Sequence, residues 1–159
     1  MALEIAKIRN VGIVGHGGVG KTSLVEMLLF TAGALTRLGR VDDGTSTTDF
    51  DPDEVKRKIS INTAVAFCDY KAHRINVVDT PGYGDFIADA RAGLRAADAA
   101  VVVVDGVAGV QVQTEKVWKI ASARTSSGLW NRSPGSRAGC SRSTSRWARS
   151  PGSAASSIS

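Results

Sequence analysis

The sequence predicts an α/β fold with a doubly wound, mostly parallel sheet. Up to about Ala121, apolar runs of strand length alternate with stretches of helical periodicity, which is the order of elements in such folds. A glycine-rich loop lies between the first strand and the first helix. An Asp-Thr-Pro-Gly turn follows the third strand. Both turns are typical of a sheet that carries a ligand at the carboxyl ends of its strands.

The first half of the ordered region is expected to supply three strands and one helix. Residues 11–14 form an apolar strand, and apolar residues at helical spacing follow from Leu24 to Leu29. Residues 33–58 are rich in Gly, Asp, Thr and Ser, which predicts a long loop. Residues 70–73 predict a hairpin turn into a third strand at 74–79. The second strand is predicted from an alternating apolar face: Ile59, Ile61, Thr63, Val65 and Phe67.

The second half is expected to supply two helices and another strand. Residues 99–104 are uninterrupted apolar residues and predict a strand that is buried on both faces. Residues 85–97 predict a helix with these inward residues: Phe86, Ala90, Leu94 and Ala97. A last helix opens at 114–121 with Val117, Trp118 and Ala121 inward, so we expect Trp118 in the core.

Charge divides the chain into two parts. The 159 residues contain 20 Lys or Arg and 15 Asp or Glu, for a net charge of +5. All 15 acidic residues and 14 basic residues precede residue 122, which leaves 14 − 15 = −1 there, and six arginines follow. We expect a partial, incomplete domain at 1–121 and a disordered Ser/Arg-rich tail at 122–159, because such a composition buries little apolar area. The tail's residue types are typical of GC-rich codons in a shifted frame, so a frameshift near residue 121 is expected.

Cysteine usage and hydropathy exclude several classes of protein. We expect Cys68 to be buried in a strand, whereas Cys140 lies in the tail, so neither a disulfide framework nor a metal-ligand spacing is present. The first residues lack the apolar core of a signal peptide, and the run at 99–104 is too short to span a bilayer. The expectation is a cytoplasmic protein without membrane contact and without a nucleic-acid-binding module in its ordered part.

The strongest motif is G-x-x-x-x-G-K-[ST] at residues 15–22, which predicts a P-loop NTPase. Backbone N–H groups of such a loop hold phosphates, and larger side chains at Gly15 and Gly20 would block their approach. Lys21 places a positive charge on the β- and γ-phosphates, and Thr22 offers its hydroxyl to Mg²⁺. The predicted phosphate-binding residues are Gly15, His16, Gly17, Gly18, Val19, Gly20, Lys21 and Thr22.

The second motif is the Asp-Thr-Pro-Gly turn at residues 79–82. A carboxylate at Asp79, at the end of a strand beside the P-loop, can hold Mg²⁺ through water. The Gly82 N–H can meet a γ-phosphate oxygen and so respond to its presence. The turn therefore adds Asp79, Thr80, Pro81 and Gly82 to the predicted phosphate site.

Residues 9–121 resemble the N-terminal half of the GTPase domain of elongation factor G, especially its elongation factor G-like variant. The resemblance rests on IRNVGIVGHGGVGKTSLVEMLLF, GRVDDGTSTTDFDPDEVKRKISI and VVDTPGYGDFIADARAGLRAADAAVVVVDGVAGVQVQTEKVW. It implies a translational GTPase that binds GTP or GDP with Mg²⁺ and acts on the ribosome. It also implies three Mg²⁺ ligands: Thr22, Asp79 and Ser60, the last standing in place of the first-switch Thr. The family's Gly before that Thr is replaced by Lys58-Ile59 here, so we expect a different closure of this loop.

The resemblance assigns catalytic roles to Lys21 and Tyr83. Tyr83 stands where elongation factor G has a His that positions the attacking water. A phenol orients water through a hydrogen bond but does not carry the positive charge available to an imidazole. Loss of a general acid or base costs about 10²- to 10⁴-fold in rate. The Gly-Tyr-Gly-Asp-Phe sequence is shared with the elongation factor G-like variant.

Several functions are compatible with these motifs. The leading interpretation is a fragment of a translational GTPase that binds and hydrolyses GTP. The alternatives are a non-catalytic phosphate-binding fragment or pseudogene product, a different P-loop ATPase, and an Arg/Ser-rich RNA-binding protein with a nucleotide switch. The family's guanine-reading sequence, Asn-Lys-x-Asp, does not occur in the 159 residues.

We therefore expect the 159-residue chain to bind nucleotides mainly through their phosphates and to distinguish guanine poorly from adenine. Titrations of labelled GDP and labelled ADP measure this directly. A preference for GDP above about 100-fold, near 2.7 kcal/mol, would mean that another residue reads the base.

Overall fold

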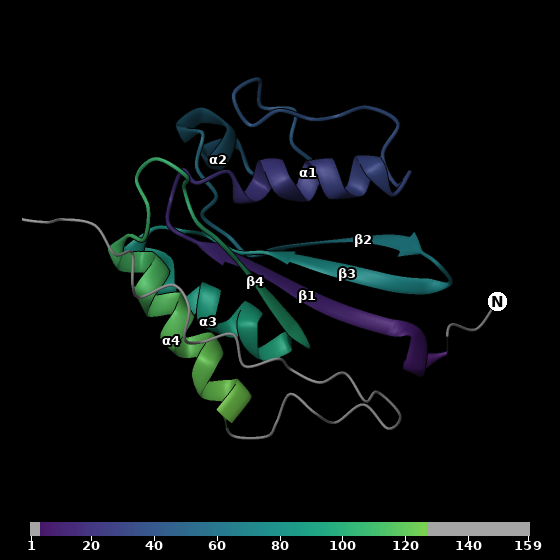
Figure 1. Cartoon of the computed structure of the whole chain (residues 1–159). Helices are drawn as coiled ribbons and strands as arrows, with labels where there is room; N and C mark the ends of the chain where they lie inside the picture. Colours follow the sequence, from purple (N-terminus) through teal and green to yellow (C-terminus); the bar gives the residue numbers. More distant parts are fainter. Residues whose placement is uncertain (1–3, 127–159) are drawn as a thin grey trace, which may run out of the picture.

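The computed structural model describes residues 4–126 and confirms an α/β fold around a four-stranded mixed sheet (Figure 1). Its strands are β1 (Ile8–Gly15), β2 (Ala64–Tyr70), β3 (His73–Asp79) and β4 (Ala99–Val103). Its helices are α1 (Lys21–Thr31), α2 (Pro52–Arg57), α3 (Ile87–Ala96) and α4 (Val112–Ser126), with 3-10 turns η1 (Ile5–Lys7) and η2 (Gly84–Phe86). The strand order is β2-β3-β1-β4, with β2 antiparallel to β3 and the other pairs parallel.

Each face of the sheet has its own apolar core. α1 lies over one face, and α3 and α4 lie over the other (Figure 1). Successive side chains of β1 point to opposite faces, so Ile13 packs with Val25 of α1. Its neighbour Val14 packs with Leu94 of α3 and Val117 of α4. This central strand therefore joins both layers and ends directly in the P-loop.

The predicted hairpin between the second and third strands is confirmed. β2 ends at Tyr70 and β3 begins at His73, so only Lys71 and Ala72 form the turn. Both turn residues have positive φ, 47° and 63°. Two consecutive positive φ angles give the twist that a two-residue hairpin needs.

The second strand differs from its prediction in both extent and buried face. β2 begins at Ala64, not at residue 59, and its predicted apolar face is exposed, with Val65 at 67% and Phe67 at 56%. The opposite face, which carries the buried Cys68, packs against the α1 core. Residues 61 and 62 leave the strand because their N–H groups donate to the buried carboxylate of Glu54, each at 2.8 Å.

One helix inside the predicted loop at 33–58 was not expected. α2 begins after Asp51, whose side chain accepts from the Asp53 N–H, while Glu54 accepts from the Asp51 N–H. This reciprocal pair is a capping box, and Pro52 occupies the first turn, where a missing N–H costs nothing. The sequence Asp-Pro-Asp-Glu therefore contained a local signal for the helix.

Two burial predictions near β4 were wrong. β4 forms an edge of the sheet and pairs only with β1 within residues 4–126, so Val101 is 42% exposed. Trp118 is 49% exposed, because the inward row of α4 is formed by Thr114 and Val117. Trp118 projects to the side of that row, about 100° round the helix from Val117.

The predicted boundary after residue 121 falls inside a helix. α4 continues past Ala121 to Ser126, and the rest of the predicted tail, 127–159, lies outside the described residues. Among the described helices, none has the length and apolar character needed to cross a membrane.

We expect the 159-residue chain to self-associate through the outer edge of β4. The strand is apolar and uncharged, and in the described structure its outer N–H and C=O groups face no neighbouring strand. Val101→Lys should shift the chain toward monomer in size-exclusion chromatography at matched concentrations, whereas Val107→Lys, in the exposed loop beyond β4, should not. A monomeric wild-type chain with strongly protected amides throughout 101–103 would contradict this.

Candidate functional site

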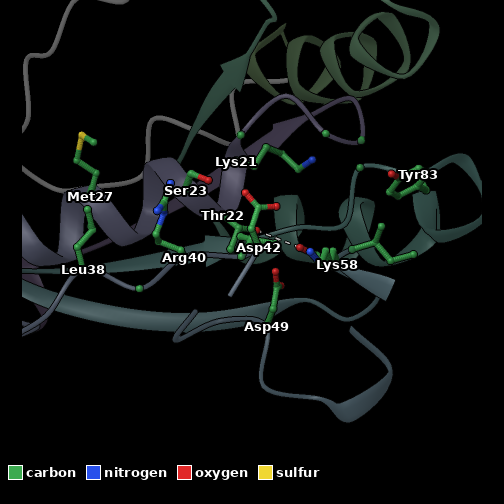
Figure 2. Close-up of a pocket in the computed structure, with 18 residues that line it drawn as sticks. Lys21, Thr22, Ser23, Met27, Leu38, Arg40, Asp42, Asp49, Lys58 and Tyr83 are labelled. Carbon is green, nitrogen blue, oxygen red and sulfur yellow. Dashed lines mark hydrogen bonds between the residues drawn. The ribbon is translucent and has the colours of Figure 1, made fainter. Parts of the chain in front are cut away.

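A cavity of about 480 Å³ lies where the carboxyl ends of β1 and β3 meet the long loop (Figure 2). The P-loop and the first turn of α1 form one wall, and the segments at 38–42, 58–60 and 82–83 form the others. Lys21 and Tyr83 lie toward one end, and Met27 and Leu38 lie toward the other (Figure 2). The end with Lys21 and Tyr83 is therefore the end formed by the P-loop and by the turn that follows β3.

The P-loop has the geometry of an anion-binding turn. It connects β1 to α1, and the first turn of α1 has no side-chain cap on its N–H groups. Gly18 and Gly20 have left-handed backbone angles, with φ of 78° and 87°. At Gly15 a Cβ would lie 2.5 Å from the carbonyl oxygen of Val103, so β4 passes too closely for any side chain. The uncapped N–H groups and the helix dipole favour a bound anion.

Lys21 is buried within this turn. Its Nζ donates to the carbonyl oxygen of His16 at 2.9 Å. Burial lowers the pKa of the Lys21 ammonium, while the charges of Asp79 and Asp49 raise it. A buried cation held by one neutral oxygen has donor capacity left for a phosphate.

Three predicted magnesium ligands meet at the end of β3. The Thr22 hydroxyl donates to Asp79 Oδ2 at 2.7 Å and lies 3.0 Å from the Ser60 hydroxyl oxygen. Thr48 also donates to Asp79 Oδ2, at 3.2 Å. The pKa of Asp79 is raised to about 6, chiefly because burial disfavours the charged form; the Thr22 hydrogen bond lowers this pKa and the nearby Asp49 charge raises it. The α1 terminus, the long loop and β3 therefore converge on one buried carboxylate.

Asp49 is a second buried carboxylate in the same cluster, and sequence reasoning missed it. It lines the cavity beside Ser60, which hydrogen-bonds it. Burial raises the pKa of Asp49, chiefly by desolvation. Asp49 Oδ2 and Asp79 Oδ1 are both buried without a hydrogen-bond partner. Two unpartnered carboxylate oxygens beside hydroxyl groups are the donor set that Mg²⁺ prefers, so the residues fit this cation.

Two buried glutamates hold the long loop in place. Glu26 of α1 accepts the N–H groups of Gly39 and Thr47, at 3.1 and 2.5 Å. Glu54 accepts the N–H groups of Ile61 and Asn62. A Cβ at Gly39 would lie 2.7 Å from Glu26 Oε2, so the loop passes very close to α1 there. These contacts place Asp49 and Ser60, which lie between them, against the P-loop.

The other predicted residues lie along the P-loop. Thr80 donates to the Ile13 carbonyl oxygen at 2.7 Å and is buried with Pro81. Lys58, near which the resemblance to elongation factor G implies a Gly, adopts a left-handed conformation with φ 55° and ψ 40°, a backbone that glycine favours. In the described part of the chain, no group of three or more His, Cys, Asp or Glu side chains is arranged as a metal centre.

Comparison with known proteins identifies the family. A family described as the elongation factor Tu GTP binding domain matches residues 6–127. The chain belongs to this family. The resemblance inferred from the sequence motifs is thereby confirmed.

Relatives of this GTP-binding domain are much longer proteins. This chain is 46% identical over 122 residues to mitochondrial ribosome-releasing factor 2 of Candida albicans, and the match covers 77% of this chain and 15% of the relative. It is 44% identical over 118 residues to elongation factor G of Granulibacter bethesdensis, covering 74% and 17%. A crystal structure from Thermus thermophilus matches with a TM-score of 0.71 and 48% identity, covering 74% of this chain and 18% of that chain. The chain therefore spans less than a fifth of the length of these proteins.

The raised pKa of Asp79 predicts a pH-dependent stability. The folded chain binds a proton at Asp79 more tightly than the unfolded chain does, so the free energy of unfolding falls as pH rises from about 4 through about 6. Asp79→Asn, which keeps an acceptor oxygen but carries no charge, should therefore raise the free energy of unfolding at pH 7 by up to about 3 kcal/mol.

Urea unfolding at pH 4.5 and pH 7, without Mg²⁺ or nucleotide, measures this difference. Asp79→Asn should change the free energy of unfolding much less at pH 4.5, because Asp79 is protonated in the folded chain at that pH. Asp89→Asn, at an exposed position of α3, is the matched control. Equal effects of Asp79→Asn at both pH values would refute the argument.

Proposed function

We propose that this chain is a GTP-binding and GTP-hydrolysing unit of the elongation factor G type. The observation that carries the proposal is the Thr22 hydroxyl, which contacts both Ser60 and Asp79 next to the buried Lys21. A site for a nucleoside triphosphate and its magnesium ion requires a P-loop, a carboxylate at a strand end and a loop hydroxyl, and these three groups meet here at one point. Membership of the GTP-binding family supports guanine nucleotide as the ligand.

In this proposal each group has one role. The P-loop N–H groups and Lys21 bind the β- and γ-phosphates. Thr22, Ser60 and Asp79 hold Mg²⁺, which, when bound, neutralises negative charge on the phosphate oxygens. The Gly82 N–H contacts the γ-phosphate, and the Tyr83 hydroxyl orients the attacking water. Relatives named elongation factor G and ribosome-releasing factor 2 support the ribosome as a partner, and a cytoplasmic location remains our expectation.

The proposal predicts separate effects of Lys21 and Ser60 on nucleotide binding. Lys21→Ala should weaken GDP binding at least about tenfold with or without Mg²⁺, because a hydrogen bond to a charged group contributes roughly 1.5 to 3 kcal/mol. Ser60→Ala should weaken binding only when Mg²⁺ is present. Fluorescence titration of labelled GDP in Mg²⁺ and in EDTA measures both effects.

Lys116→Ala, on the exposed side of α4, serves as the control for removal of a positive charge. Binding that survives Lys21→Ala unchanged would contradict a P-loop mode of binding. A loss in Ser60→Ala that is the same in EDTA would contradict its role as a metal ligand.

A second candidate is a nucleotide-binding unit that does not turn over. Tyr83 supports it, because a neutral phenol lacks the positive charge that an imidazole can supply to the transition state. Single-turnover release of phosphate from bound GTP separates the two candidates. Release that Tyr83→Phe slows supports the GTPase, whereas no release from the wild-type chain supports the binder.

A further inference from the structure

Among the P-loop glycines, Gly17 is the one for which neither a left-handed backbone angle nor contact with a neighbouring strand accounts for the lack of a side chain. Gly18 and Gly20 have left-handed φ angles that favour glycine, and Gly15 is pressed against the β4 backbone. Gly17 is not among the glycines with positive φ. Its backbone is therefore open to residues with side chains, and some other contact must account for the glycine.

That contact is the ring of Tyr83. A Cβ at Gly17 would lie 2.8 Å from Cζ, 2.9 Å from Cε2 and 3.0 Å from Cε1 of Tyr83. All three atoms belong to the hydroxyl end of the ring, and the two distances below 3.0 Å are shorter than real Cβ atoms essentially ever show, so the ring would have to shift. The phenol end of Tyr83 therefore lies directly on the P-loop backbone, in space that any side chain at residue 17 would occupy.

The backbone before and after Tyr83 leaves the ring little room to retreat. At Gly82 a Cβ would lie 2.2 Å from Lys21 Nζ and 2.6 Å from the Gly17 nitrogen, so this segment already touches the P-loop. On the other side, the Tyr83 carbonyl oxygen accepts the Phe86 N–H of η2 at 3.1 Å. Displacement of the ring would therefore move it outward, toward the cavity opening, where Tyr83 is already 41% exposed.

We infer that Gly17 is a positioning residue for Tyr83. Because Gly17 has no side chain, the phenol ring packs directly against the P-loop backbone at the phosphate end of the cavity. We call this contact between the Tyr83 ring and the Gly17 backbone the seat. This inference rests on the proposed function for its kinetic consequence, because Tyr83 acts on water only in that proposal. The seat itself is a property of the nucleotide-free chain. The effects of substitutions at Gly17 and Tyr83 should therefore be coupled, because a side chain at residue 17 would displace the ring at residue 83.

Ring resonances of tyrosine test the seat without nucleotide. The chain contains two tyrosines, so ring-labelled protein gives two sets of signals, which Tyr70→Phe assigns. Gly17→Ala should shift the Tyr83 signals and leave those of Tyr70 in place. Gly106→Ala should leave both unchanged, because Gly106 has no neighbour within 4 Å of an added Cβ and no positive φ. Unchanged Tyr83 signals in Gly17→Ala would overturn the inference.

A double-mutant cycle tests the coupling. Gly17→Ala should lower the midpoint of urea unfolding when Tyr83 is present and have little effect in a Tyr83→Ala background. A Gly17→Ala chain that fails to fold alone but folds with Tyr83→Ala supports the seat. Equal destabilisation in both backgrounds, or failure to fold in both, overturns it.

Kinetics separate this inference from the proposed function. If the wild-type chain turns over GTP, Gly17→Ala should lower kcat about tenfold or more, because the displaced Tyr83 hydroxyl no longer orients the attacking water. A loss of affinity with unchanged kcat would overturn the positioning role. If the wild-type chain does not turn over GTP, the proposed GTPase fails, and the resonances and the cycle still decide whether the seat exists.

Discussion

A buried carboxylate at the end of β3 is the point on which the site depends. Asp79 Oδ2 accepts hydrogen bonds from Thr22 at the start of α1 and from Thr48 of the long loop, and Thr22 in turn contacts Ser60. Removing a carboxylate from water is costly, and the raised pKa of Asp79 expresses that cost. The hydroxyl groups offset part of that cost, whereas Asp79 Oδ1 is buried without a hydrogen-bond partner.

The long loop is held next to Asp79 by two other acidic side chains that are also buried. Glu26 and Glu54 accept backbone N–H groups on either side of Asp49 and Ser60, so the loop is fixed by hydrogen bonds more than by apolar packing. These hydrogen bonds satisfy backbone N–H groups that would otherwise be buried without partners, which suits a segment with few apolar side chains.

Short sequence motifs predicted those parts of the site whose structure depends on neighbouring residues in the chain. The P-loop and the Asp-Thr-Pro-Gly turn have fixed spacings, so the sequence predicted that the two turns lie side by side, and Thr22 contacts Asp79 in the structure. Asp49 was not predicted because no motif or periodicity surrounds it, and its position beside Ser60 in the cavity depends on how the long loop folds. Trp118 and Val101 were misplaced for a related reason: whether a helix side or a strand face is covered depends on which element lies at the edge of the sheet. The capping box of α2 was different, since Asp51 and Glu54 are a short-range signal that was overlooked.

The order of the strands has a consequence for how the chain folds. The β2–β3 hairpin closes a turn of two residues, whereas the contact between Thr80 and the Ile13 carbonyl joins residues 67 apart in sequence. Closing a long loop loses more chain entropy than closing a short one, so the parallel pairing of β1 with β3 costs more chain entropy than the hairpin does. The P-loop and Asp79 come together only in this more costly pairing. A ligand that bridges them binds only the folded chain, and by mass action it stabilises the pairing that is entropically most costly to make.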